Sequence, residues 1–101
     1  MILKNDYSYE ISENVTILRR ADGLIIQYFT ATYRARDGAN GTIISIPVAF
    51  NENFYFAISS DGASGCHTVS ALPHSLTSAR IIGAVGERYA DSYLQIVAVG
   101  R

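Results

Sequence analysis

Chemically reactive side chains are scarce in this chain of 101 residues. Ser64, Cys66 and His67 lie close together in the sequence, and Cys66 is the single cysteine, so no intrachain disulfide can form. Neighbouring residues on a strand point to opposite faces, so Cys66 and His67 do not readily make a nucleophile–base pair. We therefore expect no catalytic residue here, and we interpret Cys66 as a small buried side chain beside a loop histidine.

The carboxylates and histidines do not form the spaced set that a metal site needs. Five acidic residues stand in turn sequences, where aspartate commonly caps the backbone: Asp22, Asp37, Asp61, Glu87 and Asp91. His67 and His74 are the only histidines, and Pro73 lies between them. A symmetric trimer would bring three copies of one histidine together, which leaves a metal on its axis as an alternative. The chain by itself predicts no metal, no phosphate-binding loop and no cofactor.

Polar loops with aromatic residues are the remaining candidates for a binding function. The segment from Gly86 to Tyr93 mixes Tyr, Arg, carboxylate and small residues, a combination that suits contacts to a sugar as it suits antibody paratopes. The segment from His67 to His74 is a second candidate. For both segments, an ordinary solvated loop remains the alternative. We therefore expect the contacts in three loops, those around Asp61–His67, His74–Ser78 and Glu87–Asp91. The candidate contact residues are Asp61, Ser64, His67, His74, Glu87, Arg88, Tyr89 and Asp91.

Length and composition restrict the class of protein. A chain of 101 residues predicts one domain, and its 49% hydrophobic content is enough for a modest core. The net charge is −1 and the charged residues are scattered along the chain. This argues against a nucleic-acid partner, because nucleic-acid-binding proteins carry a basic patch. The chain contains no run of about 18 apolar residues, so we expect no membrane-spanning helix. Met1–Leu3 is followed by polar residues, so we expect no signal peptide.

Short strand-like runs separated by turn signals fill most of the chain. Residues 1–13 show little strand signal and are expected to be a lead-in or linker, with residues 14–101 as a single β domain. Asp22-Gly23 predicts a two-residue type I′ hairpin between Asn14–Arg19 and Leu24–Tyr33, because both central positions of that turn need positive φ. Leu24–Tyr33 is rich in β-branched and aromatic residues, which favour strands.

The remaining runs give the fold class. The further expected strands are Thr42–Ile46, extended past Pro47 to Phe50, then Phe54–Ser59, His67–Leu72, Arg80–Val85 and Tyr93–Val99. Pro47 is expected at a sheet edge or bulge and Pro73 at a strand end, with residues 74–79 as a crossing loop. About six to seven short strands at this spacing predict an all-β fold, a small antiparallel β-sandwich or barrel.

Three motifs follow one another along the chain: Gly23–Tyr28 (GLIIQY), Ile44–Phe50 (ISIPVAF) and the closing Ile96–Arg101 (IVAVGR). In residue types, order and spacing they resemble the C-terminal tip domains of phage tail fibres, and the resemblance covers about residues 15–101. The family often has Trp-Gly where this chain has Tyr28-Phe29, and an aromatic residue where it has Arg101. These motifs are structural, so they assign no binding residue to this chain.

The resemblance implies a function for the chain. Domains of this family are similar to trimeric lectins, so it implies a homotrimer of small sandwiches at the tip of a fibre on the virion, soluble and without enzymatic activity. Residues 1–13 would then lead to the fibre shaft. The expected partner is a host cell-surface glycan of the lipopolysaccharide type, bound for host recognition and adsorption. The alternatives are a structural trimerisation cap, a standalone lectin, or an enzyme, which would need a clustered acid pair or a nucleophile dyad.

Overall fold

The computed structural model describes residues 7–63 and 66–101. This part of the chain contains nine β-strands and one short 3₁₀ helix. The elements are β1 (Tyr7–Ser12), β2 (Val15–Arg20), β3 (Ile25–Tyr33), η1 (Ala35–Asn40), β4 (Thr42–Ser45), β5 (Phe54–Asp61), β6 (Thr68–Ser75), β7 (Ser78–Val85), β8 (Arg88–Tyr89) and β9 (Ser92–Gly100). The all-β class is confirmed, while the strand number exceeds the predicted six to seven. In these residues, no helix is long and apolar enough to cross a bilayer.

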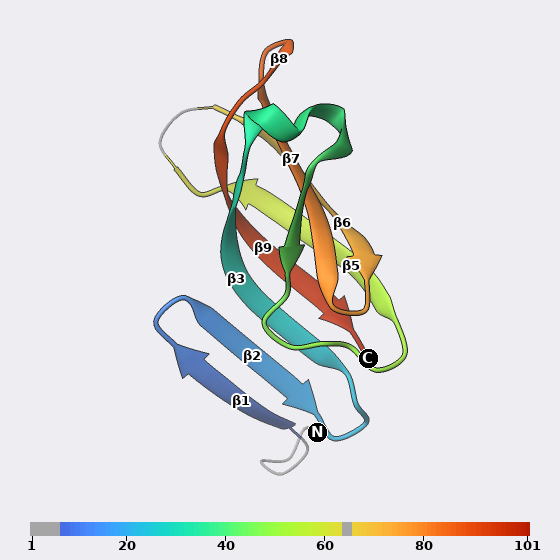
Figure 1. Cartoon of the computed structure of the whole chain (residues 1–101). Coiled ribbons are helices and arrows are strands. Elements are labelled where there is room, and N and C mark those ends of the chain that lie inside the picture. The colour runs from blue at the N-terminus through green and yellow to red at the C-terminus, as the bar shows by residue number, and fades with distance from the viewer. Residues whose placement is uncertain (1–6, 64–65) are drawn as a thin grey trace.

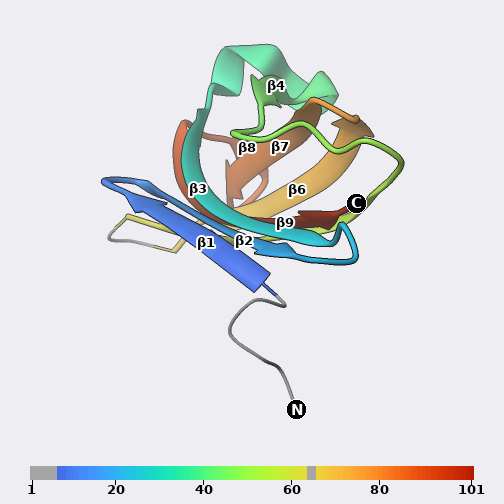
Figure 2. The ribbon, with the colours of Figure 1, turned by 90° about the horizontal axis from the view of Figure 1, so that it is seen from below.

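The strands form two antiparallel sheets. The larger has the order β1-β2-β3-β9-β5, and the smaller has the order β4-β7-β6 with β8 paired to β7. The smaller sheet lies over β3 and β9 (Figure 1), and the view from below shows the two layers one above the other (Figure 2). The predicted antiparallel sandwich is therefore confirmed.

The core lies between these layers and follows the alternation of β3 and β9. In β9, Leu94, Ile96 and Ala98 face the smaller sheet and are fully buried, while the residues between them face outward. Phe29 and Tyr33 of β3 share this inner face. Alternation of this kind is what a half-buried strand requires, and it explains why the sequence predicted both strands well.

The β1–β2 hairpin extends the larger sheet beyond the smaller one. β1 pairs with β2 from Tyr7↔Arg20 to Ser12↔Val15, and every residue of β1 is exposed. Figure 1 shows β1 as the outermost strand beyond β2, away from the strands of the smaller sheet. Residues 1–13 were expected to be a lead-in with little strand character, and this is wrong for residues 7–12, which form a strand. Residues 1–6 lie outside the described part. Tyr7, Tyr9 and Ile11 do alternate with Ser8, Glu10 and Ser12, so the period-2 pattern is present in the sequence, but the polar composition of the segment outweighed it.

The turn between β2 and β3 is longer than predicted. The two strands are joined by residues 21–24, with Gly23 N–H donating to the Arg20 carbonyl at 3.0 Å and Arg20 N–H to the Leu24 carbonyl at 2.8 Å. Gly23 has φ of 99°, but in the described residues positive φ occurs only at glycines, so Asp22 does not take the type I′ conformation. Asp22 instead accepts the N–H of Leu24 with its side chain at 3.2 Å.

Two further segments differ from their predictions. Pro73 does not end a strand: β6 runs on to Ser75 and turns tightly into β7, so the predicted crossing loop at 74–79 is a hairpin. Proline is tolerated there because β6 is an edge strand, and its register shifts between Pro73 and Ser75. Residues 46–53 are not a strand, although Ile46 and Phe50 are buried.

Backbone and side-chain hydrogen bonds hold this irregular segment in place. Gln27, fully buried in β3, donates from Nε2 to the Val48 carbonyl and accepts the Val48 N–H at Oε1, both at 2.9 Å. Further along, the N–H groups of Asn51, Glu52 and Asn53 all donate to the Arg101 carbonyl oxygen, at 3.0, 2.6 and 3.1 Å. The segment therefore closes one side of the sandwich without joining a sheet.

Candidate functional site

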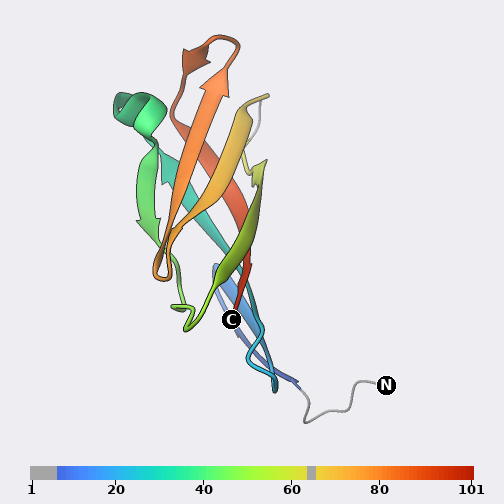
Figure 3. The same ribbon diagram turned by 90° about the vertical axis from the view of Figure 1, so that its right-hand side faces the viewer.

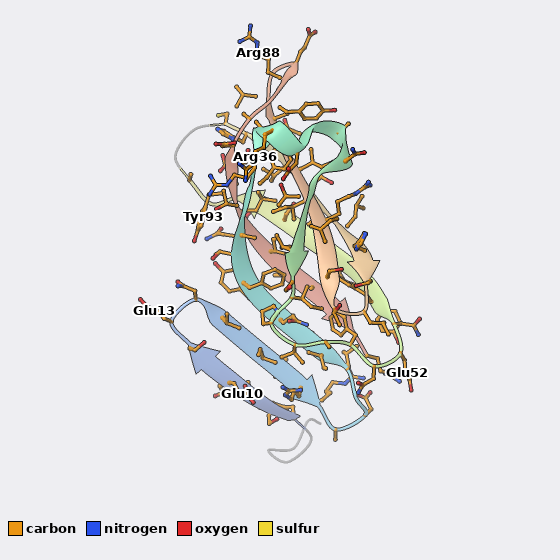
Figure 4. The ribbon with its side chains drawn as sticks, viewed as in Figure 1. Glu10, Glu13, Arg36, Glu52, Arg88 and Tyr93 are labelled. Atoms are coloured by element: carbon orange, nitrogen blue, oxygen red, sulfur yellow. The ribbon has the colours of Figure 1, made fainter. Side chains whose placement is uncertain are left out.

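The fold brings two of the three predicted loops to one end of the molecule. The β5–β6 connection and the β7–β9 segment lie there together with η1, whereas the β1–β2 hairpin lies at the other end (Figure 3). Figure 4 shows Arg36 and Arg88 at this loop end and Glu10 at the opposite end. The predicted third loop, after His74, lies away from the loop end, at the β6–β7 turn.

Asp61 shapes the β5–β6 connection. Its Oδ1 accepts the N–H of Ala63 at 3.0 Å, and its Oδ2 accepts the N–H of His67 at 3.1 Å. These two backbone donors hold the pKa of the Asp61 carboxyl below its usual value. Both oxygens are thus used inside the loop, which makes Asp61 a loop-positioning residue. Ser64 lies outside the described residues.

His67 is hydrogen-bonded to the start of β9. Its Nδ1 lies 2.8 Å from Ser92 Oγ, and the Ser92 hydroxyl donates to the Ala90 carbonyl at 2.7 Å. Since that single hydroxyl proton points to Ala90, Nδ1 of His67 is the donor, the reverse of what a base beside a nucleophile needs. Ser92 is also buried. This histidine–serine pair therefore links the two loops and does not present a nucleophile to solvent.

Gly83 makes room for this pair. A Cβ atom on Gly83 would clash with the Ser92 side chain, because it would lie closer than van der Waals contact allows. Neither Ser92 nor Gly83 was predicted from the sequence, because neither belongs to a recognisable motif.

Cys66 is exposed, so its interpretation as a buried side chain is wrong.

His74 lies apart from the loop end. Its Nδ1 is 3.0 Å from Ser78 Oγ across the β6–β7 turn, and it borders a shallow pocket of about 280 Å³ with Glu52 and Phe54. His67 and His74 therefore stand at the two ends of β6. In the described part of the chain, no group of three or more His, Cys, Asp or Glu side chains is placed to hold a metal ion.

The loop end also contains a charged pocket that the sequence analysis did not find. Arg34, Arg36 and Asp91 line a volume of about 390 Å³. Arg34 follows β3, Arg36 belongs to η1, and Asp91 precedes β9. The Ala35 N–H donates to Asp91 Oδ1 at 2.8 Å and so joins segments 56 positions apart. Only Asp91 of these three was predicted; the Arg-Ala-Arg sequence before Asp37-Gly38 is the signal that was available.

Glu87, Arg88 and Tyr89 form the outermost part of this end. All three are exposed, and Gly86 starts their turn with φ of 59°. Tyr33, buried beneath them, donates its hydroxyl to the Gly38 carbonyl of η1 at 2.9 Å, and burial raises the pKa of Tyr33. This hydrogen bond fixes η1 on the core. The end as a whole offers exposed charged, aromatic and hydroxyl groups on an anchored base, an arrangement for binding polar ligands.

Two solved structures of similar fold are pyocin tail fibres. The chain matches an N-truncated R1-type pyocin tail fibre with a TM-score of 0.67 and 18% sequence identity, over 94% of this chain and 85% of that one. It matches the C-terminal part of the P. aeruginosa R1 pyocin fibre with a TM-score of 0.65 and 19% identity, over 94% of this chain and 28% of that one. At such identities the likeness is one of fold. No protein-family model and no curated protein matches the sequence.

Proposed function

We propose that this chain is the receptor-binding tip domain of a phage-type tail fibre, a virion component that binds a host cell-surface glycan of the lipopolysaccharide type. The observation that carries the proposal is the fold likeness to pyocin tail fibres, which extends over 94% of the chain. The arrangement of the ends supports it. β1 starts at one end and two of the three candidate loops lie at the other, as expected for a domain joined to a fibre through its N-terminal side (Figure 3).

We further propose that the domain works as a homotrimer. The outer face of the larger sheet supports this, because opposed residues on neighbouring strands point to the same side. Two rows of mostly apolar residues cross all five strands; they are Tyr9, Leu18, Ile26, Val99 and Phe56, and Ile11, Thr16, Tyr28, Val97 and Ile58. We call these ten residues the outer rows.

Solvent exposure makes the outer rows a natural contact for further copies of the chain. Ile11 is 72% exposed, Tyr9 and Ile58 are each 61% exposed, and Phe56 is 46% exposed. A contiguous exposed apolar patch of this kind usually marks an interface. Three tethered copies would also present three loop ends, so weak single sites would act together through multivalency. The remainder of the tail fibre is the other expected partner.

The proposal includes no enzymatic activity. Among the described residues of the loop end, His67 and Ser92 make the one histidine–serine contact. In this contact His67 is the hydrogen-bond donor and Ser92 is buried, which supports the absence of a nucleophile. Loss of host polysaccharide on incubation with the domain would overturn this part of the proposal.

Binding to immobilised intact lipopolysaccharides, from a panel of strains, tests the function. We expect saturable binding to at least one of them, and we expect Tyr89→Ala to weaken it by about tenfold or more, because exposed tyrosines are common binding hot spots. Tyr55→Ala is the matched control, since the two side chains are 49% and 48% exposed and Tyr55 lies on β5 away from the loops. Equal binding by the two variants, or no binding by the unaltered domain, would contradict the proposal.

A structural trimerisation cap is the second candidate, and the outer rows are the observation that favours it. An assembly role needs such a surface but no contact to the host. It predicts that variants in the loops around Asp61–His67 and Glu87–Asp91 leave adsorption to host cells unchanged, while variants in the outer rows break the trimer. The two candidates are therefore separated by the same set of loop variants.

A further inference from the structure

The pocket at the loop end is held in a defined geometry. Ala35 lies between Arg34 and Arg36, and its N–H is bonded to Asp91. Arg34 N–H in turn donates to Thr42 Oγ1 at 3.1 Å, and the Thr42 hydroxyl donates to Asp37 Oδ2 at 2.6 Å. The backbone that carries both arginines is thus tied to β4 and to the segment before β9. Preorganisation of this kind lowers the entropic cost of binding.

The charged groups of the pocket keep unused hydrogen-bonding capacity. Arg34 Nη1 and Asp91 Oδ2 are 3.9 Å apart, too far for a direct hydrogen bond, and these side chains are 54% and 64% exposed. A gap of this length suits an inserted hydroxyl, which would accept from Arg34 and donate to Asp91. Within the described residues, Arg36 is exposed and takes part in no salt bridge, so its guanidinium group is not committed to a carboxylate.

The chemistry of the lining selects the class of ligand. Two arginines and one aspartate give the lining a net positive charge, and planar guanidinium groups bind carboxylate or phosphate in a bidentate way. A lining of charged groups also disfavours an apolar ligand. The volume of about 390 Å³ lies within the usual range for small-molecule sites, roughly 300–1,000 Å³.

We propose that the pocket lined by Arg34, Arg36 and Asp91 binds an anionic sugar unit. The anionic group, a phosphate or a carboxylate, contacts the two guanidinium groups, and a neighbouring hydroxyl bridges Arg34 and Asp91. This inference rests on the proposed function, because it names the chemical class of glycan that the fibre tip would recognise.

Titration of the whole chain by NMR tests the pocket without requiring the receptor. The probes are glucose 6-phosphate, glucuronate, inorganic phosphate and glucose. We expect saturable shifts at residues 34–36 and 91 with one of the two anionic sugars, and the stronger of the two identifies phosphate or carboxylate as the anion. Glucose should give none. Inorganic phosphate binding as tightly as the sugar would contradict the bridging hydroxyl, and equal shifts with glucose would overturn the proposal.

Matched arginine variants complete the experiment. Arg36→Gln should weaken binding of the anionic sugar by about tenfold or more, since a charge-assisted contact is lost. Its thermal midpoint should not change, because Arg36 is exposed. Arg19→Gln makes the same change of charge on β2, where the arginine has only an exposed contact of 3.9 Å to Glu10, and should bind normally. Equal affinity of the two variants would overturn the pocket.

The outcomes also separate this inference from the proposed function. If the domain binds lipopolysaccharide and Arg36→Gln binds it equally well, the proposed sugar site in the pocket is refuted and the fibre-tip function stands. If the domain binds an anionic sugar at residues 34–36 but no lipopolysaccharide, the pocket stands and the lipopolysaccharide receptor is wrong.

Discussion

Gln27 links the larger sheet to a segment that has no sheet partner of its own. Its amide makes two hydrogen bonds to the backbone of Val48, and its side chain is fully buried among apolar neighbours. Buried polar groups are costly unless they are paired, so this amide and the Val48 peptide groups depend on each other. The apolar Ile46 and Phe50 are thereby held against the core.

Replacing Gln27 by leucine should therefore destabilise the domain. We expect Gln27→Leu to lower the free energy of unfolding by about 2–4 kcal/mol, because the Val48 N–H and carbonyl lose their partners. Chemical denaturation measures this change. Gln95→Leu is the control on the outer face of β9, where Gln95 is exposed and accepts only a 3.3 Å contact from Ser60, and its effect should stay within about 0.5 kcal/mol. Similar losses in both variants would contradict the role of Gln27.

Asp22 gives the domain a pH-dependent contribution to stability. Arg20 donates to both carboxylate oxygens, with Nε–Oδ1 at 3.2 Å, and the Leu24 N–H donates as well. These donors lower the pKa of Asp22 from 3.8 to about 2. A folded-state pKa below the unfolded one stabilises the fold fully above the unfolded value, and this contribution is lost as the pH falls through the folded value.

Asp22→Asn should accordingly flatten the acid limb of the stability profile. Between pH values of about 4 and 2, the thermal midpoint of the unaltered domain should fall more steeply than that of the variant. The difference should shrink at high salt, because the Arg20–Asp22 pair is exposed and screened. Parallel profiles for the two proteins would show that this turn contributes nothing to the pH dependence.

At the scale of elements, the sequence predicted the strands whose two faces differ. β3 and β9 alternate between a buried and an outer side, and their predicted ranges, Leu24–Tyr33 and Tyr93–Val99, agree with the structure to within a residue or so. β1 was missed although Tyr7, Tyr9 and Ile11 alternate with polar residues, because the segment is polar as a whole and this chain buries neither of its faces. The β6–β7 hairpin was missed because Pro73 and its polar neighbours have the composition of a loop, while their position on a sheet edge is a property of the whole fold.

The candidate site was predictable only in part, for a related reason. The turn residues Asp61, Glu87, Arg88, Tyr89 and Asp91 were recognisable from local composition. Arg34 and Arg36 were not, because they gain a common pocket with Asp91 only when η1 folds back against β7 and β8. Local patterns indicate which segments are loops, whereas the grouping of loops at one end depends on sheet order.

At the scale of the whole molecule, the larger sheet has an outer face that its own chain leaves open. The smaller sheet covers only the inner side (Figure 2). The β1–β2 hairpin adds Tyr9 and Ile11 to the outer rows. A monomer would expose these side chains to water, at a cost that assembly removes. The hairpin therefore adds to the outer face and not to the monomer core, which is why we propose that it belongs to the trimer surface.

The trimer can be tested through the most exposed members of the outer rows. Ile11→Lys combined with Ile58→Lys should change the mass in solution from about three times 11.0 kDa to 11.0 kDa, measured by light scattering. The fold should survive, because these side chains are 72% and 61% exposed and β1 contributes nothing to the core. Leu72→Lys is the control: Leu72 is 44% exposed but lies on β6 of the other sheet, so the trimer should persist. A stable monomer before any substitution would refute the homotrimer, and a trimer that tolerates both lysines would place its interface on another surface.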